Sequence, residues 1–193
     1  MSNIPISRFE PPKLADLPKD IAERIAAVQE KSGFVPNVFL ALARRPEEFR
    51  AFFAYQDALM EKPGRLSKAE REMIVVATSG LNKCQYCVVA HGAILRIRAK
   101  NSLIADQVAI NHRKADITPR ETAMLDFAMK VAARSHEIDD ADYAALSAHG
   151  FTDDDAWDIA AIAAMFAMSN RLANAFSIRP NVEFYVMGRE PKR

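Results

Sequence analysis

Residues 67–99 read SKAEREMIVVATSGLNKCQYCVVAHGAILRIRA. The stretch opens with Ser67-x-x-Glu70, the spacing of a capping box, in which a hydroxyl precedes a helix and a carboxylate occupies its third position. The alternation of Val, Ile and Thr with polar residues that marks a strand is absent, both here and in the rest of the chain. We therefore predict two helices in this stretch, over residues 67–81 and 84–99.

The rest of the chain has the same helical character. Thr118-x-x-Glu121 and Thr152-x-x-Asp155 repeat the capping-box spacing. Only 6 of the 193 residues are Gly and 10 are Pro, and Ala is abundant, so the expected fold class is all-α. The other predicted helices span residues 18–31, 37–44, 46–61, 101–112, 118–135, 139–149 and 152–176. The last of them is strongly apolar, and we expect it to be central.

Nothing in the pattern divides the chain into two domains. Pro and Gly residues separate the predicted helices, but no Ser- or Gly-rich linker separates two halves. We predict a single all-helical domain over residues 1–193 with short N-terminal and C-terminal arms. The C-terminal arm, after Phe176, holds the apolar residues Phe184–Met187 and has no helix cap. Four large side chains at helical spacing are expected in the core or at a subunit interface: Trp157, Met165, Phe166 and Met168.

Composition argues against several classes of partner. The chain has 26 Lys and Arg against 25 Asp and Glu, so it need not carry the basic stripe that binds a phosphate backbone. Its longest apolar run, Ile159–Met168, has ten residues, about half of the ~20 that cross a bilayer. The N-terminus shows no basic segment followed by an apolar run. We expect a cytoplasmic protein that binds neither nucleic acid nor membranes.

Both cysteines of the chain belong to one motif, Cys84-x-x-Cys87-x-x-x-His91. On a helix, at about 100° per residue, these three residues fall on one stripe, so two thiols and an imidazole lie together. His91 lies one turn after Cys87 and is the natural base, which favours Cys87 as the attacking thiol. A helix N-terminus also lowers the pKa of a thiol, and that effect favours Cys84 instead.

Three interpretations compete for this cluster. Zinc normally takes four ligands, and His112, His136 and His149 stand in no ligand-spaced group. Two buried cysteines and a packed histidine can also belong to an inert core. A dithiol redox centre explains the shared stripe best, and we expect it to need neither a metal nor another cofactor.

Glu72, twelve residues before Cys84, completes a pattern that resembles a known active site. Together with Cys84-x-x-Cys87-x-x-x-His91 it resembles the active-site pattern of the alkylhydroperoxidase AhpD and carboxymuconolactone decarboxylase superfamily, in its peroxidase-related branch. The upstream sequence GFVPN, residues 33–37, is similar to the N-terminal segment of that superfamily. The resemblance spans about residues 30–175.

The resemblance implies an AhpD-like multi-helix fold and a thiol-dependent peroxidase. In that family pattern Glu72 holds His91, and His91 deprotonates a cysteine. The second cysteine, Cys87, attacks the hydroperoxide, and Cys84 then resolves the sulfenic acid into a disulfide. The resemblance also implies a homo-oligomer, either a trimer or a hexamer. The reductant would be a thiol or a lipoyl group that the sequence does not identify.

Tyr86 stands where the best-known family pattern has a histidine, so a proton carrier is missing there. Glu70 lies two residues from Glu72, and periodicity does not choose between them, but Glu70 already serves the capping box of Ser67. A carboxymuconolactone decarboxylase-like enzyme remains an alternative function. So does a non-catalytic helical module with a redox-sensing or zinc-binding site.

Overall fold

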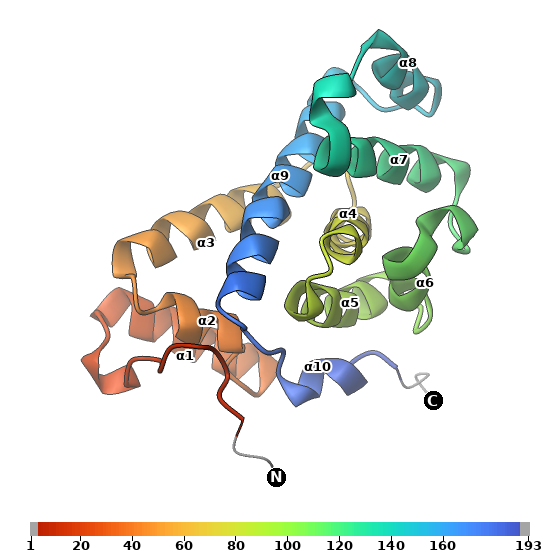
Figure 1. Ribbon diagram of the computed structural model, residues 1–193. Helices are drawn as coiled ribbons and strands as arrows, with labels where there is room; N and C mark the ends of the chain where they lie inside the picture. Colours follow the sequence, from red (N-terminus) through yellow and green to blue (C-terminus); the bar gives the residue numbers. More distant parts are fainter. Residues whose placement is uncertain (1–3, 190–193) are drawn as a thin grey trace.

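The computed structural model describes residues 4–189, and its backbone winds through a succession of helices (Figure 1). The helices are α1 (Lys19–Ser32), α2 (Asn37–Leu42), α3 (Pro46–Met60), α4 (Lys68–Leu81), α5 (Gln85–Ala99), α6 (Ile104–Asn111), α7 (Pro119–Arg134), α8 (Asp140–Ala148), α9 (Asp153–Ala175) and α10 (Val182–Val186). Residues 4–189 contain no strand. The predicted all-α class is therefore confirmed.

The helix starts follow the caps read from the sequence. The three predicted capping boxes are all formed, at Ser67 and Glu70, Thr118 and Glu121, and Thr152 and Asp155. A fourth, not predicted, joins Asp139 to Asp142 at the start of α8. Because each box satisfies backbone N–H groups that the helix itself leaves free, the helix begins where the hydroxyl or carboxylate stands.

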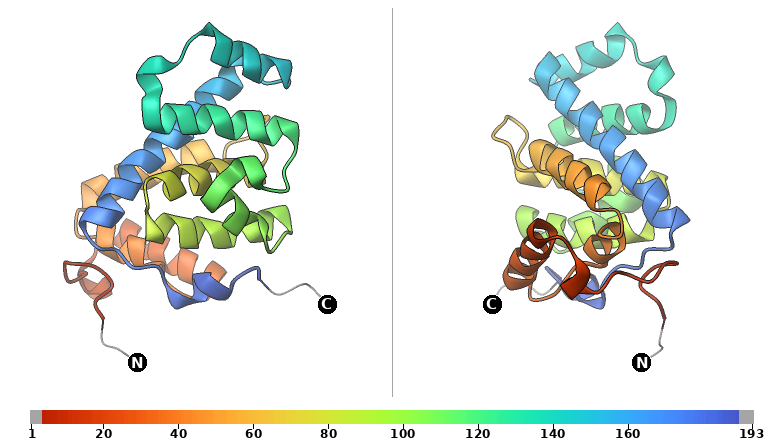
Figure 2. Two further views of the ribbon diagram at one scale, coloured as in Figure 1. Left: turned by 45° about the vertical axis from the view of Figure 1, so that its right-hand side comes forward. Right: turned by 90° about the vertical axis from the view of Figure 1, so that its left-hand side faces the viewer.

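Helix α4 is the most deeply buried element. Every residue from Glu70 to Ser79 is buried, because α5, α6, α7 and α9 all pack around α4. Helix α9 runs diagonally across the bundle (Figure 2) and also touches α3, α5, α7 and α8. The centre of the fold is thus α4, and the long apolar helix α9 lies beside it.

Two hydrophobic clusters divide the interior. The larger cluster is built on α4 and gathers side chains from residue 59 to residue 184. The smaller cluster ties α1, α2 and α3 together through Ile21, Ile25, Ala43, Phe49 and Phe53. Phe52 and Val38 touch both clusters, so the N-terminal helices α1–α3 face the main bundle across a boundary lined with apolar side chains.

The C-terminal arm is predicted to have no helix cap, and no side-chain cap forms, yet the arm contains a helix that was not predicted. It forms the short helix α10, which packs on α5, and the guanidinium of Arg96 donates to the carbonyl oxygens of Phe184 and Met187, each at 2.9 Å. The N-cap residue, Asn181, uses its side chain elsewhere: it accepts from the N–H of Asn37 at 2.8 Å and donates to the carbonyl of Val35 at 2.9 Å. These tertiary bonds hold the arm in place of a local cap.

The expectation of a core position is wrong for Trp157, whose side chain is 75% exposed on α9. Met168 is also exposed, whereas Met165 and Phe166 are buried as expected. A subunit interface over Trp157 stays a prediction. Within residues 4–189, no helix combines the length and the apolar content that a bilayer crossing requires.

Helices α4 and α6 approach each other closely at Gly80. A methyl group on Gly80 would lie 2.3 Å from the carbonyl oxygen of Ala109, and this oxygen belongs to the backbone, so it cannot swing aside. We predict that Gly80→Ala lowers the free energy of unfolding by about 2 kcal/mol. Elsewhere in a helix the same change usually raises it by about 0.5–1 kcal/mol. Urea denaturation followed by circular dichroism measures the difference.

Gly92→Ala is the matched control, because its methyl group would meet the Ala105 side chain at 3.4 Å, an acceptable contact. This variant should be as stable as the wild type or more stable. If Gly80→Ala proved equally stable, the close approach of α4 and α6 would carry no cost and the packing argument would fail.

Candidate active site

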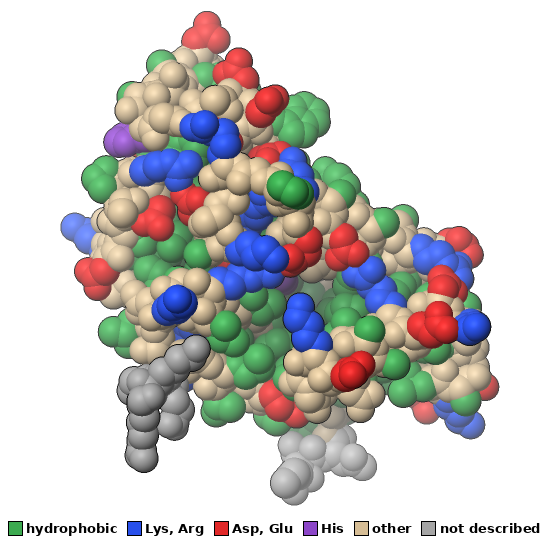
Figure 3. Space-filling model, turned by 180° about the vertical axis from the view of Figure 1, so that it is seen from behind, with side chains coloured by type: hydrophobic (Ala, Val, Ile, Leu, Met, Phe, Trp, Pro, Cys, Tyr) green, Lys and Arg blue, Asp and Glu red, His purple; other side chains and the backbone are tan. Residues whose placement is uncertain are grey.

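A small cavity lies at the boundary between the N-terminal helices and the main bundle. Its volume is about 90 Å³, and its lining includes Phe39, Phe52 and Phe53 from one side and Tyr86, Cys87, His91, Ile94, Phe166, Ser169 and Phe184 from the other. On the back face of the molecule a hollow floored by hydrophobic side chains lies between the same two groups of helices (Figure 3). Of the residues predicted to be catalytic, Cys87 and His91 line this cavity.

The turn between α4 and α5 sets the position of the first cysteine. Lys83 adopts a left-handed backbone conformation, with φ of 52°, and the chain then returns so that the N–H of Cys84 donates to the carbonyl of Ser79 at 3.0 Å. Cys84 is the N-cap of α5, one residue before the first helical turn. The amide of Asn82 donates to Asn170 Oδ1 of α9 at 3.0 Å, which anchors the turn.

The two thiols form one hydrogen-bonded pair. Cys84 is 0% and Cys87 is 2% exposed. The hydrogen bond from Cys87 lowers the pKa of Cys84 to about 7, helped by the backbone N–H groups of Cys87 and Tyr86 and by the amide of Asn170. The same hydrogen bond, together with burial, raises the pKa of Cys87 well above its usual value. As the pH rises above about 7, the pair therefore comes to carry one negative charge and one proton.

Helix α9 supplies polar groups to this pair. The hydroxyl of Ser169 lies 3.8 Å from Cys87 Sγ, and the buried amide of Asn170 donates to Ser79 Oγ at 3.0 Å. Both side chains act to lower the pKa of Cys87. The sequence analysis missed these two residues. A signal for them exists, because this polar pair directly follows the longest apolar run of the chain.

Glu72 reaches His91 from the neighbouring helix. Glu72, on α4, is 2% exposed, and its Oε2 atom lies 2.8 Å from His91 Nδ1. An ionised carboxylate only accepts hydrogen bonds, so Nδ1 carries the proton in this contact, and in a neutral imidazole the lone pair is then on Nε2. The edge of the imidazole packs on Phe166, with ring centroids 4.7 Å apart. This arrangement leaves Nε2 as the basic atom of His91.

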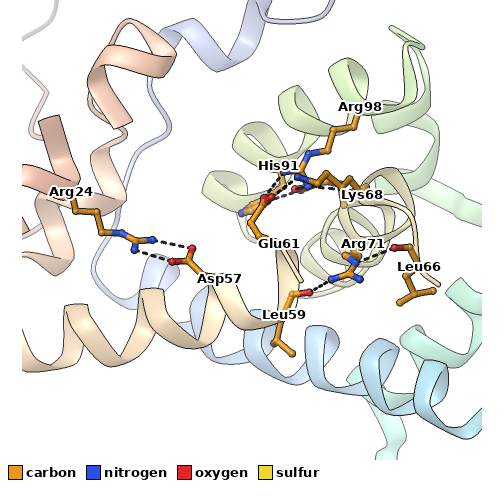
Figure 4. A network of polar contacts seen from close by, with 10 residues as sticks. Arg24, Asp57, Leu59, Glu61, Leu66, Lys68, Arg71, His91 and Arg98 are labelled. Atoms are coloured by element: carbon orange, nitrogen blue, oxygen red, sulfur yellow. Dashed lines mark hydrogen bonds and ion pairs between the residues drawn. The ribbon is translucent and has the colours of Figure 1, made fainter. Parts of the chain in front are cut away.

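Charged residues continue from Glu72 toward the surface (Figure 4). Arg98 Nη1 lies 3.0 Å from Glu72 Oε1, and Arg98 Nη2 lies 2.8 Å from Glu61 Oε1. The Nζ atom of Lys68 lies 2.6 Å from the other oxygen of Glu61. No feature of the sequence separates Arg98 from Arg96, its neighbour two residues away, so sequence reasoning missed this residue as well.

Glu70 and Tyr86, which lie next to the site residues in the sequence, serve structural roles. Glu70 forms the capping box of Ser67, as predicted, and also pairs with Arg120. The hydroxyl of Tyr86 accepts from the N–H of Val38 at 3.3 Å, and burial raises the pKa of Tyr86. Tyr86 thus connects α5 to the start of α2 and stays protonated.

The other histidines lie away from the dithiol. His112 pairs with Asp126 at 2.7 Å, His136 lies beside Glu137, and His149 lines a separate surface cleft with Asp142. Across the described part of the chain, no group of three or more His, Cys, Asp and Glu side chains gathers as metal ligands do.

Comparisons with known proteins agree with this fold and site. The profile of the carboxymuconolactone decarboxylase family matches residues 46–103, which contain Glu72, both cysteines and His91. An uncharacterized peroxidase-related protein from Ralstonia eutropha JMP134, whose solved structure is described as an alkylhydroperoxidase AhpD core, is 67% identical. The match covers 98% of this chain and 100% of that chain, with a TM-score of 0.97.

Other solved structures are similar as well. An uncharacterized peroxidase-related protein from Silicibacter sp. TM1040 is 41% identical over 98% of this chain and 100% of that chain, with a TM-score of 0.91. The debrominase Bmp8, 20% identical over 98% of this chain and 99% of that chain, shares the fold with a TM-score of 0.76. The comparison with curated proteins found no match. The chain belongs to the AhpD-like carboxymuconolactone decarboxylase superfamily, and the resemblance seen in the sequence is confirmed.

The thiol pair predicts two separate ionisations. Thiolate absorbance at 240 nm of the reduced protein should show one step as pH rises through about 7, from Cys84, and a second step far above it. In Cys87→Ala the first step should move up toward the usual value of about 8.5, because the largest cause of the low pKa, the hydrogen bond from Cys87, is gone. In Cys84→Ala the step near pH 7 should vanish. A step near pH 7 that persists in Cys84→Ala would assign the low pKa to Cys87.

Proposed function

We propose that the protein is a thiol-dependent peroxidase that reduces hydroperoxides through the Cys84 and Cys87 dithiol. One observation carries the proposal: Cys87 and His91 line the same apolar cavity, while Cys84 does not line it and shares a hydrogen bond with the Cys87 thiol. A substrate in the cavity meets one thiol and a base, and the second thiol is already in place to close a disulfide. Membership of a superfamily with peroxidase-related members supports an enzymatic role.

The first step forms a sulfenic acid. The single negative charge of the pair arises when His91 takes one of its two protons, which leaves one thiol, one thiolate and an imidazolium. The thiolate attacks the terminal oxygen of the hydroperoxide ROOH. The S–O bond forms, the O–O bond breaks, and the alkoxide leaves with the proton of the imidazolium as ROH. Glu72 holds the imidazole in orientation and stabilises its positive charge.

We assign the attack to Cys87. Cys84 has no exposed surface and does not line the cavity, whereas Cys87 does. The resting charge of the pair lies on Cys84, so transfer of the Cys87 proton along the hydrogen bond must move the charge before attack. The hydroxyl of Ser169 and the amide of Asn170 then stabilise the charge on Cys87.

The second step restores the site. Cys84 attacks the sulfur of the Cys87 sulfenic acid, and the S–S bond forms as the sulfenic oxygen leaves as water with the Cys84 proton. Two thiols or one reduced lipoyl group, which become a disulfide, then supply two electrons and two protons and return both cysteines to thiols. No metal or organic cofactor takes part in this sequence.

The walls of the cavity favour an uncharged organic hydroperoxide. Apart from the imidazole, no charged side chain lines it, and five phenylalanine rings do. Transfer of an alkyl or aryl group from water to such walls is favourable, so these walls stabilise a bound organic hydroperoxide, whereas hydrogen peroxide has no apolar group to bury.

Thiol titration tests the proposal. The reduced protein should hold two thiols, and one equivalent of tert-butyl hydroperoxide should consume both, because the pair closes a single bridge. Ellman's reagent counts the thiols, and dithiothreitol should restore them. Consumption of no thiol, or stoichiometric zinc in the purified protein, would overturn the peroxidase assignment and favour a sensing or zinc-binding module.

Replacing each cysteine should affect the reaction with hydroperoxide in a different way. Cys87→Ser should abolish hydroperoxide consumption, because the remaining thiol does not face the cavity. Cys84→Ser should react once, more slowly than the wild type, and accumulate a sulfenic acid on Cys87 with no thiol to resolve it. Mass spectrometry after dimedone labelling locates the adduct. An adduct on Cys84 in Cys87→Ser, with none on Cys87 in Cys84→Ser, would show that the roles are reversed.

A further inference from the structure

We propose that Arg98 is a positioning residue of this site, which holds the Glu72 carboxylate in the orientation that fixes the His91 imidazole. The proposal rests on the proposed function, in which His91 is the base. Arg98 acts through Glu72 and touches neither the cavity nor the reacting sulfur atoms.

The two oxygens of Glu72 are divided between two donors on one helix. Oε2 faces His91 Nδ1 at 2.8 Å, and Oε1 faces Arg98 Nη1 at 3.0 Å. His91 and Arg98 stand two turns apart on α5, so both donors reach across to α4 from the same side. With both oxygens held, the carboxylate cannot rotate, and its direction fixes the ring of His91.

Nothing else in the site replaces Arg98. A buried carboxylate needs a cation or several hydrogen bonds to offset the loss of water. Within residues 4–189, Arg98 is the only lysine or arginine whose side chain pairs with Glu72. Helices α9 and α10 present Phe166, Ser169 and Phe184 to the same cavity, and none of these carries a charge.

The side chain of Arg98 is itself held in place by more exposed charged residues. Its second nitrogen, Nη2, binds Glu61 at 2.8 Å, and Lys68 binds the other oxygen of Glu61 at 2.6 Å. Glu61 lies just after α3, in a connection that Arg71 fixes by donating to the carbonyl of Leu66 at 3.2 Å and to that of Leu59 (Figure 4). The planar fork of an arginine spans Glu72 and Glu61 together, which a single ammonium group does less well.

The first test replaces Arg98 with residues of similar length. Arg98→Met keeps the apolar stem but removes the charge and the fork. With tert-butyl hydroperoxide and dithiothreitol, kcat should fall roughly 10-fold, the lower end of losses for partners that orient a functional histidine in metal sites. KM should not change, because Arg98 lies outside the cavity. Arg98→Lys should recover part of the loss. Arg113→Met, which removes an exposed ion pair with Asp126, is the control and should keep wild-type kinetics.

A spectroscopic measurement separates this proposal from the proposed function. The ¹⁵N chemical shifts of His91 report which ring nitrogen carries the proton, and they need no peroxide. The wild type should show the Nδ1–H tautomer, and Arg98→Met should show a mixture of the two. An unchanged tautomer in Arg98→Met would overturn the positioning role even if the protein proved to be a peroxidase. A changed tautomer in a protein without peroxidase activity would support the positioning role and refute only the activity.

A double variant tests whether Arg98 acts through Glu72. Glu72→Gln should lower kcat, and adding Arg98→Met to Glu72→Gln should lower it no further, because the carboxylate that Arg98 holds is already gone. If the fold-loss in kcat of the double variant equalled the product of the two single losses, Arg98 would support the fold or the site by another route. That result would overturn the proposal. Circular dichroism of each variant verifies that the helices are intact.

Discussion

The contact between Glu72 and His91 is the constraint on which the rest of the site depends. A carboxylate and an imidazole are held 2.8 Å apart in the interior only if α4 and α5 keep a fixed register. The short turn through Lys83 and the close approach of α4 to α6 at Gly80 supply that register. The complete burial of the middle of α4 follows from the same packing, since a helix that carries a buried carboxylate must be enclosed on every side.

The main bundle and the N-terminal helices contribute different kinds of side chain to the site. The main bundle supplies the reactive groups, with the thiols and the histidine at the start of α5 and along it, the carboxylate on α4 and the hydroxyl and amide on α9. The N-terminal helices supply mainly apolar walls, among them Phe39, Phe52 and Phe53, together with the amide side chain of Gln56. In the proposed reaction, changes in those walls would alter which organic group fits beside Cys87, whereas the proton and electron chemistry would stay with the bundle. Substrate preference and reactivity can therefore vary independently.

The sequence predicted what depends on local signals. The capping boxes placed the helix starts, and the spacing of Glu72, Cys84, Cys87 and His91 brought the expected groups together. The failures involve contacts between distant segments. Helix α10 is held by side-chain bonds of Asn181 to residues 35 and 37. Arg98 differs from Arg96 only in its partners, because Arg98 pairs with Glu72 of α4 and Arg96 donates to carbonyl oxygens of the C-terminal arm. Trp157 has the spacing of a core residue, yet it lies on the outer face of α9, because periodicity fixes a stripe and not the partner that covers it.

Tyr86 shows how one substitution narrows the mechanism. Its position suggests a lost proton carrier, and the structure uses the phenol to anchor α2 through the N–H of Val38. Because burial raises the pKa of Tyr86, this hydroxyl cannot take a proton from a thiol and return it near neutral pH. Of the described residues that line the cavity, His91 is the base in the proposed reaction. Proton transfer then depends on one imidazole, and the fixed orientation of that imidazole by Glu72 matters more than it would in a site with two carriers.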